Sequence, residues 1–392
     1  MVDVSRTVRC VVVPPVAAPY REPLFEALHT SHPEIELSVI YQAAEQPSWD
    51  VPDQYFATDH AYPARHLRSW QHARPGRTPI VWPRGLEKAL QSADPDCVVG
   101  WEYGPAALRS LRWCRTHKRA YVVFTECTPQ IDGMLSPGQL RMHRWIALRA
   151  DGLIAVSSAA RERLLGFGVA DDRITVALQS ADLGTIREAA AAHHEGSDGD
   201  AGAEPAGHPL RVLSVGRLVP DKNHETLIEA FVRVHPDRIP AELHIAGDGF
   251  LEPELQQLAE DRHVPVVFHG HIETDELAEL YASSDVFALV SIYEPFGVAV
   301  REAAAADLPI VCSRQVGAAG DVAIADRNAL LVDPQDAQAC ADALARVLSD
   351  DELRARMAAE SHRIDEETRG KDVEAFAGAV LAAARRRGRL QE

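Results

Sequence analysis

Two acidic residues flank a short loop in the segment SIYEPFGVAVREAAA, residues 291–305. Glu294 and Glu302 are separated by seven residues, and Gly297 lies between them at the expected start of a helix. Free N–H groups at a helix start attract anions, and a glycine lets a phosphate approach the backbone closely. The pattern predicts an anion site at Gly297 and Val298, with a carboxylate on either side suited to sugar hydroxyls. The alternative is two surface acids beside a helix start.

Two cations lie on one loop in the segment SVGRLVPDKNHETLIEAF, residues 214–231. Arg217 follows an apolar run, and Lys222 comes five residues later, just before the next expected helix. Arginine binds phosphate oxygens through its planar fork, and lysine acts as a point charge. The spacing predicts a site for a diphosphate, against the alternative of two solvated loop cations.

Short β-branched runs alternate with longer segments rich in Ala, Leu and Glu, which is typical of βαβ units and a parallel sheet. The pattern occurs twice, and we expect an α/β protein with two doubly wound Rossmann-like domains. In such sheets ligands bind beyond the carboxyl ends of the strands. The strands expected in the first half are residues 8–13, 35–41, 96–100, 120–124, 152–157 and 174–177.

The 392 residues exceed the usual size of one hydrophobic core, so two domains are expected. Residues 187–209 show no apolar periodicity and predict a flexible linker. The expected organisation is an acceptor-side domain over 1–186, this linker, a donor-binding domain over 210–368, and a C-terminal helix over 369–392 that packs back toward the first domain.

The motifs GRLVPDKN, HIAGDGFL, FHGHI and YEPFGVAVREAAA occur in an order and spacing that resemble glycosyltransferase family 4, most strongly over residues 209–365. The resemblance implies the B-type glycosyltransferase fold, with two domains facing each other across a cleft, and a retaining reaction. It assigns Arg217 and Lys222 to the donor diphosphate, Glu302 to the ribose and Glu294 to the transferred sugar. The backbone of Phe296, Gly297 and Val298 would line sugar and phosphate, and Gly247 and His271 would lie near the nucleoside.

Two departures of the first half from the family pattern concern the acceptor side, and a third replaces an Asn-Gly dipeptide by QSAD at 179–182. The glycine-rich loop after the first strand is replaced by PPVAAPYREPLFEAL, where Tyr20 and Arg21 either contact the acceptor or belong to a stiff loop. The family histidine after the strand AYVVF is absent, and Thr125, Glu126 and Cys127 occupy its place. We expect Glu126 to act at the acceptor side, directly or by supporting another polar group.

Charge and residue spacing limit the partners. A formal net charge of −18 argues against nucleic acid. No His, Cys or acid cluster has the usual ligand spacing, so we expect no metal and no bound cofactor beyond the nucleotide-sugar co-substrate. The N-terminal apolar run is too short for a signal peptide, which predicts a cytoplasmic protein, a monomer or homodimer. Membrane contact, through the helix over 140–151 or the RRRGR tail, is the less favoured reading.

These observations predict a glycosyltransferase of the hexosyl or N-acetylhexosaminyl type. It would transfer a hexose-type sugar from a nucleotide-diphosphate donor to a hydroxyl in polysaccharide, glycolipid or natural-product biosynthesis, with retention and without a metal. The alternatives are a sugar-nucleotide epimerase, which needs no acceptor, and a non-catalytic sugar-nucleotide binding subunit.

Overall fold

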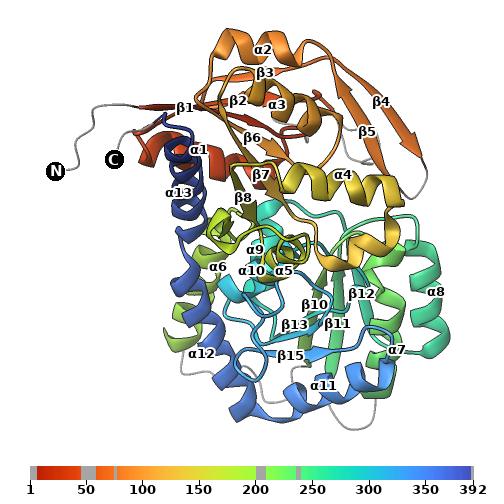
Figure 1. The fold of residues 1–392 in the computed structure, drawn as a ribbon. Helices are drawn as coiled ribbons and strands as arrows, with labels where there is room; N and C mark the ends of the chain where they lie inside the picture. The colour runs from red at the N-terminus through yellow and green to blue at the C-terminus, as the bar shows by residue number, and fades with distance from the viewer. Residues whose placement is uncertain (1–6, 46–58, 75–76, 200–208, 235–239, 390–392) are drawn as a thin grey trace. The chain divides into compact units, whose positions relative to one another are not determined.

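The computed structural model describes residues 7–45, 59–74, 77–199, 209–234 and 240–389. The chain divides into two compact units, one formed by residues 1–181 and 370–392 and the other by residues 182–369. Each unit is an open parallel sheet with helices on both faces (Figure 1). The expected pair of doubly wound Rossmann-like domains is confirmed.

Unit 1 has a seven-stranded sheet in the order β3-β2-β1-β6-β7-β8-β9, in which all neighbours are parallel. Its strands read as continuous apolar runs because both faces are covered. Helices α2 to α5 cover one face, and α1 and α13 cover the other. The strands are β1 (Val8–Val13), β2 (Ile35–Tyr41), β3 (Ala64–His66), β6 (Cys97–Trp101), β7 (Ala120–Thr125), β8 (Gly152–Ala155) and β9 (Ile174–Val176). The helices are α1 (Glu22–Ser31), α2 (Leu86–Ala93), α3 (Pro105–Thr116), α4 (Pro137–Ala147), α5 (Ser158–Gly166) and α13 (Lys371–Arg386).

The segment between β2 and α2 contains strands that sequence reasoning did not predict. Besides β3, it forms an antiparallel hairpin of β4 (Ser69–Arg74) and β5 (Arg77–Pro83). Arginines and prolines hide the strand pattern there, because both residue types are uncommon in central strands. The two strands form a separate two-stranded sheet at the surface of unit 1.

Unit 2 has a six-stranded parallel sheet in the order β12-β11-β10-β13-β14-β15. Helices α7, α8 and α11 cover one face together with the first turns of α12, and α6, α9 and α10 lie on the other side, where α12 contacts α10. The strands are β10 (Leu210–Val215), β11 (Ala241–Ala246), β12 (Val266–Gly270), β13 (Val286–Leu289), β14 (Ile310–Ser313) and β15 (Ala329–Val332). The helices are α6 (Gly184–Gly199), α7 (His224–Val234), α8 (Glu252–Arg262), α9 (Thr274–Ala282), α10 (Val298–Ala305), α11 (Ala337–Ser349) and α12 (Asp351–Thr368).

The expected linker over 187–209 is wrong in its first part. Residues up to Gly199 belong to α6, which packs against α9 and α10 within unit 2. Leu183, Ile186 and Ala190 are buried at helical spacing, and four consecutive alanines favour the helix. Alanine is weakly apolar, so this stripe is faint in the sequence. Residues 200–208 lie outside the described part of the chain.

The C-terminal helix α13 belongs to unit 1, where it contacts α1 and the strands β7, β8 and β9 (Figure 1). Phe376 and Val380 are buried on its inner face, and the Phe376 ring lies 6.1 Å from that of Phe124. Arg387 pairs with the Asp151 carboxylate at 2.7 Å, and Arg389 donates to the Lys118 carbonyl at 2.8 Å. These arginines of the RRRGR tail bind unit 1 itself.

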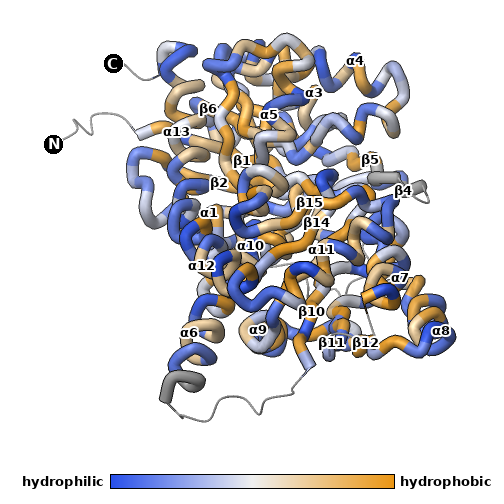
Figure 2. Tube along the Cα trace, turned by 90° about the horizontal axis from the view of Figure 1, so that it is seen from below, coloured by the Kyte–Doolittle hydropathy of each residue, from blue (hydrophilic) through white to orange (hydrophobic). Residues whose placement is uncertain are grey.

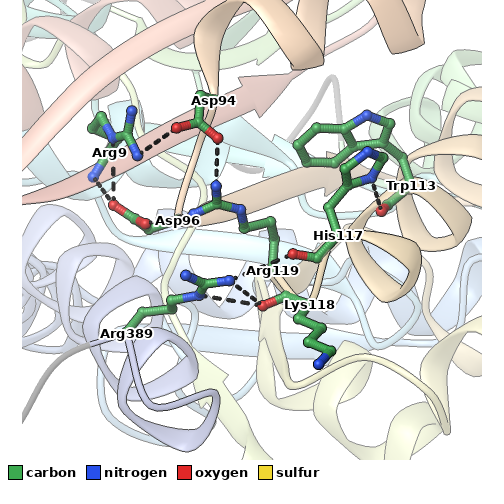
Figure 3. A network of polar contacts seen from close by, with 8 residues as sticks. All are labelled: Arg9, Asp94, Asp96, Trp113, His117, Lys118, Arg119 and Arg389. Carbon is green, nitrogen blue, oxygen red and sulfur yellow. Dashed lines mark hydrogen bonds and ion pairs between the residues drawn. The ribbon is translucent and has the colours of Figure 1, made fainter.

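The Asp-Pro-Asp triplet at 94–96 lies in the same region, at the amino-terminal end of the sheet (Figure 3). Asp94 forms an ion pair with Arg9 at 2.9 Å, and Asp96 forms one with Arg119 at 2.9 Å. Both acids therefore neutralise structural arginines. The cores of the two units are formed by the strands and the inner helix faces, and central strands such as β1, β6 and β14 are coloured as hydrophobic in Figure 2.

Candidate functional site

The switch point of the sheet in unit 2 lies at β10. On one side of β10 the strand order runs to β11 and β12, and on the other side it runs to β13, β14 and β15. Ligands of open α/β sheets bind beyond the carboxyl ends of the strands at such a point. Arg217 follows β10 and is exposed, whereas Lys222 is half-buried just before α7. The Lys222 ammonium forms an ion pair with the Glu294 carboxylate, which follows β13. The structure thus brings together two residues that are 72 positions apart in the chain.

The loop that carries Glu294 is held through its backbone carbonyls, which accept hydrogen bonds from the segment at Gly317 and Ala318. The Gly317 amide donates to the Glu294 carbonyl at 3.0 Å, and the Ala318 amide donates to the Phe296 carbonyl at 2.7 Å. A Cβ added at Gly317 would lie 1.9 Å from the Pro295 carbonyl oxygen, so only glycine fits there. The Phe296 side chain is buried and anchors the loop, which leaves its backbone as the part that can face a ligand.

Gly297 stands at the N-terminal end of α10 with φ of 92°, a left-handed conformation that favours glycine. No side chain caps this helix end, so the first N–H groups of α10, beginning at Val298, have no side-chain acceptor there. Helix starts with such N–H groups attract anions. The sequence prediction of a strand, a loop and a helix starting at this glycine is confirmed by the described elements.

Glu302 lies in α10 and is half-buried. Its carboxylate accepts a hydrogen bond of 2.8 Å from the Tyr281 hydroxyl of α9. Burial raises the pKa of the Glu302 carboxyl, and the Tyr281 hydrogen bond opposes that rise by stabilising the ionised form. Sequence reasoning did not select Tyr281, because nothing in TDELAELYA distinguishes it from a core aromatic.

Gly247 and Gly249 let neighbouring strand ends pack backbone to backbone. An added Cβ at Gly247 would lie 2.2 Å from the Gly216 carbonyl oxygen, and at Gly249 it would lie 2.4 Å from that of Leu218. The Gly247 amide donates to the Gly270 carbonyl at 2.8 Å, and the exposed His271 follows directly. The loops after β10, β11 and β12 therefore meet at one edge of the sheet. Among the described residues, no side-chain hydrogen bond or ion pair joins Arg217, Glu302 or His271 to the Lys222–Glu294 pair.

A second polar cluster lies at the switch point of unit 1, beyond the carboxyl ends of β6 and β7. Glu102 accepts hydrogen bonds of 3.0 Å from the Thr125 hydroxyl and the Cys127 thiol, and another from the Glu126 backbone amide. Burial, together with the charge of Glu126, raises the pKa of the Glu102 carboxyl to about 7. Sequence reasoning selected Glu126 and missed Glu102, although its place directly after the apolar strand DCVVGW was the available signal.

Arg21 reaches the same cluster from the loop after β1. Its side chain is 8% exposed, and its Nη2 lies 3.7 Å from Glu126 Oε1. Its guanidinium stacks over the rings of Tyr20 and Trp101, at 4.8 and 5.0 Å from the centroids. Within the described residues, Nε and Nη1 of Arg21, Oε1 of Glu126 and Nε1 of Trp101 are buried without a hydrogen-bond partner. Buried polar atoms are usually paired with protein groups, with ordered water or with a ligand, so these atoms can accept water or a polar ligand as a partner.

The described ranges contain no group of three or more His, Cys, Asp or Glu side chains arranged to hold a metal ion. They also contain no helix that is long and apolar enough to cross a bilayer. All six cysteines are free thiols, and all but the half-buried Cys127 are buried.

Two family descriptions match separate stretches of the chain. The description "Glycosyltransferase Family 4" matches residues 34–183, and "Glycosyl transferases group 1" matches residues 202–363. An uncharacterized glycosyltransferase of Methanocaldococcus jannaschii is 39% identical over 142 residues, which is 36% of each chain. The glycogen synthase of Mycobacterium tuberculosis is 31% identical over 225 residues, or 56% of this chain and 51% of that enzyme. The chain thus spans about half or less of these relatives.

Solved structures share the fold over nearly the whole chain. The Anabaena protein HepE, in complex with UDP, has a TM-score of 0.74 at 18% identity and covers 95% of this chain and 100% of its own. The sucrose-phosphate synthase of Thermosynechococcus elongatus has a TM-score of 0.71 at 19% identity and covers 95% and 98%.

Two doubly wound units with polar groups at their strand ends, in a chain with these structural neighbours, define the B-type glycosyltransferase fold. The chain belongs to glycosyltransferase family 4.

Proposed function

We propose that this protein is a retaining glycosyltransferase whose unit 2 binds a nucleoside-diphosphate sugar. The observation that carries the proposal is the gathering of Lys222, Glu294 and the uncapped start of α10 at the switch point of the unit 2 sheet. A diphosphate needs cations and free N–H groups, and this edge offers both. The HepE structures with UDP and with UDP-glucose make uridine donors the first to test.

In the proposed reaction the bond between the anomeric carbon and the diphosphate oxygen breaks. The acceptor hydroxyl oxygen forms the new bond to that carbon, and its proton passes to the departing diphosphate oxygen. Negative charge grows on the departing diphosphate, so the charges of Arg217 and Lys222 and the N–H groups at Gly297 and Val298 lower the barrier. Glu294 holds the Lys222 ammonium in place before the donor binds. This division of work needs no metal, and full activity in excess EDTA is the expected result.

The remaining donor contacts follow from the strand ends of unit 2. We propose that Glu302 binds the ribose hydroxyls and Glu294 the hydroxyls of a hexose or N-acetylhexosamine. The backbone of Phe296 would line the sugar, and Gly247 and His271 would lie beside the nucleoside. Retention predicts an α-linked product from an α-linked donor, and a β-linked product would contradict the assignment.

We place the acceptor-side groups in unit 1. Arg21 and Glu126 offer unpaired donor and acceptor atoms beside the Tyr20 and Trp101 rings, which suits a hydroxyl-bearing acceptor. Glu102 holds the backbone of Glu126 and the side chains on either side of it. We therefore propose Glu126 as the polar group that replaces the family histidine and Glu102 as its positioning residue.

The test is calorimetric binding of UDP-, GDP-, ADP- and dTDP-glucose to the wild type and to Arg217→Ala and Glu302→Ala. Arg346→Ala is the matched control, since Arg346 is exposed on α11 and has no assigned role. Binding of one donor that both site variants weaken at least tenfold, and the control does not, supports the site. Binding that is indifferent to both site changes would overturn it.

Turnover then distinguishes the classes of function. Slow donor hydrolysis, and sugar transfer once an acceptor is supplied, support a transferase. Conversion of the bound sugar to its epimer without acceptor would identify an epimerase. Donor binding without turnover across an acceptor panel would identify a binding subunit.

A further inference from the structure

The β4–β5 hairpin presents an unusual combination of exposed aromatic rings and positive charge. Trp70 and Trp82 are 53% and 50% exposed, and Ile80 is 48% exposed. Trp70 pairs with Trp82 across the strands, and His72 pairs with Ile80, so these four side chains share one face. Monomeric proteins rarely leave large apolar side chains together at the surface without a partner.

The opposite face of the hairpin packs against unit 1. Pro83 is buried and Val81 is half-buried, and β5 packs against α3. The Arg109 guanidinium of α3 donates to the Pro83 carbonyl at 2.5 Å and lies 5.4 Å from the Trp82 ring centroid. The hairpin is therefore fixed to unit 1 through β5, and although Arg109 also contacts the Trp82 ring, about half of each tryptophan side chain stays exposed.

The charge of the segment is opposite to that of the chain. Residues 60–86 contain five arginines and no acid, although the whole chain carries a formal charge of −18. Arg68 and Arg84 are exposed at the base of the hairpin, where the Arg84 amide donates to the Arg68 carbonyl at 2.8 Å. The nearby Glu87 is neutralised by Arg109 at 2.7 Å.

We propose that the β4–β5 hairpin is a docking surface for the headgroup region of an anionic lipid bilayer. Tryptophan rings favour this depth of a bilayer because they are apolar with one polar N–H, and arginines are attracted to anionic headgroups. The described residues hold no membrane-spanning helix, so the contact is peripheral. An anionic polymer would satisfy the arginines but would leave Ile80 and the Trp pair without an apolar environment. The bilayer satisfies both.

Trp145 on α4 provides a matched control. It is 43% exposed, and the Arg149 guanidinium lies 4.4 Å from its ring centroid, so it too is an exposed tryptophan beside an arginine in unit 1. It belongs to the amphipathic segment that the sequence offered as the alternative membrane contact. Comparing the hairpin with α4 therefore identifies the element responsible.

The experiment is co-sedimentation of the full chain with vesicles of phosphatidylcholine alone or mixed with phosphatidylglycerol. We expect binding to the mixed vesicles only. Arg68→Gln and Arg84→Gln should each weaken it about fivefold. Trp70→Ser with Trp82→Ser should weaken it about tenfold or more, because two apolar rings no longer leave water. Trp145→Ser should change it less than twofold.

Several outcomes would overturn the proposal. These are no binding to mixed vesicles at low salt, a Trp145→Ser effect as large as that of the hairpin variants, or retention on heparin by the hairpin arginines without vesicle binding. The last outcome would assign the surface to an anionic polymer. All substituted side chains are exposed, and the arginine variants test the surface even if the double tryptophan variant unfolds. Donor binding is measured separately, so either proposal can fail without the other.

Discussion

Replacing Glu102 by Gln should change how the stability of unit 1 depends on pH. The Glu102 carboxyl has a pKa raised to about 7 by burial and by the charge of Glu126. In the unfolded chain a glutamic acid titrates near 4.5. The folded protein therefore keeps a proton that the unfolded chain releases between these values, so the free energy of unfolding falls as pH rises through that window.

The size of the effect follows from the shift. A difference of about 2.5 pKa units corresponds to about 3 kcal/mol, and the loss is complete once the pH exceeds the folded pKa. Glutamine does not titrate, so the Glu102→Gln variant lacks this loss. Relative to wild type, the variant should gain about 3 kcal/mol of unfolding free energy between pH 4.5 and pH 7, with no further gain above.

Tryptophan fluorescence isolates the unit concerned. All six tryptophans lie before residue 181, so urea unfolding followed by fluorescence reports on unit 1 alone. Glu87→Gln is a control of opposite sign, because the hydrogen bond from Arg109 lowers the pKa of Glu87. Below pH 4.5 that variant should lose stability relative to wild type as pH rises, and above pH 4.5 the difference in unfolding free energy between the two should stay constant. If the free energies of unfolding of Glu102→Gln and wild type differ by a constant amount from pH 4.5 to pH 8, the predicted role of the Glu102 proton is wrong.

Three further predictions concern unit 2. Gly317→Ala should abolish donor binding in calorimetry, because its Cβ would lie 1.9 Å from a carbonyl oxygen. The control Gly378→Ala on α13, where an added Cβ meets nothing within 4 Å, should bind the donor normally. Normal binding by both variants would show that the loop tolerates displacement. Tyr281→Phe should weaken donor binding about fivefold to tenfold by removing the 2.8 Å hydrogen bond to the α10 carboxylate, and unchanged affinity would separate that carboxylate from the donor. Arg187→Met should lower the free energy of unfolding by about 2 kcal/mol, since the buried Asp365 loses its 2.7 Å partner and keeps, among the described residues, only Arg369 at 3.2 Å. A thermal melt that does not move would contradict this.

Except for the edge strand β3, the strands of both sheets were predictable because a parallel strand covered on both faces is a continuous apolar run. The runs at 8–13 and 35–41 coincide with β1 and β2. The hairpin was missed because its outer face is solvent-exposed and its strands mix arginine, proline and tryptophan. Helix α6 was missed because alanine gives a faint periodicity. In both cases the packing partner, α3 or α9, decides the structure, and it lies outside the local window.

The candidate site was predictable only in part, for the same physical reason. Glu294 and Lys222 stand in motifs that the residue types reveal, and their ion pair follows from strands β10 and β13 being neighbours. Tyr281 and Glu102 carry no motif. Their importance appears only when burial and hydrogen-bond partners are known, since a tyrosine in a helix and an acid after a strand each occur commonly without a role.

Substitutions in unit 2 can reduce donor binding in two ways, either by displacing a loop or by removing a contact to the donor. Gly247 and Gly317 fit backbone against backbone, so any side chain there moves a loop. A substitution at these positions should therefore reduce both stability and donor binding. Arg217 is exposed and Glu302 is half-buried with one hydrogen bond, so their replacement leaves the loops in place. If these two residues contact the donor, their variants lose binding while the melting temperature stays close to that of wild type. A parallel loss of both quantities would mean that they act by supporting the fold.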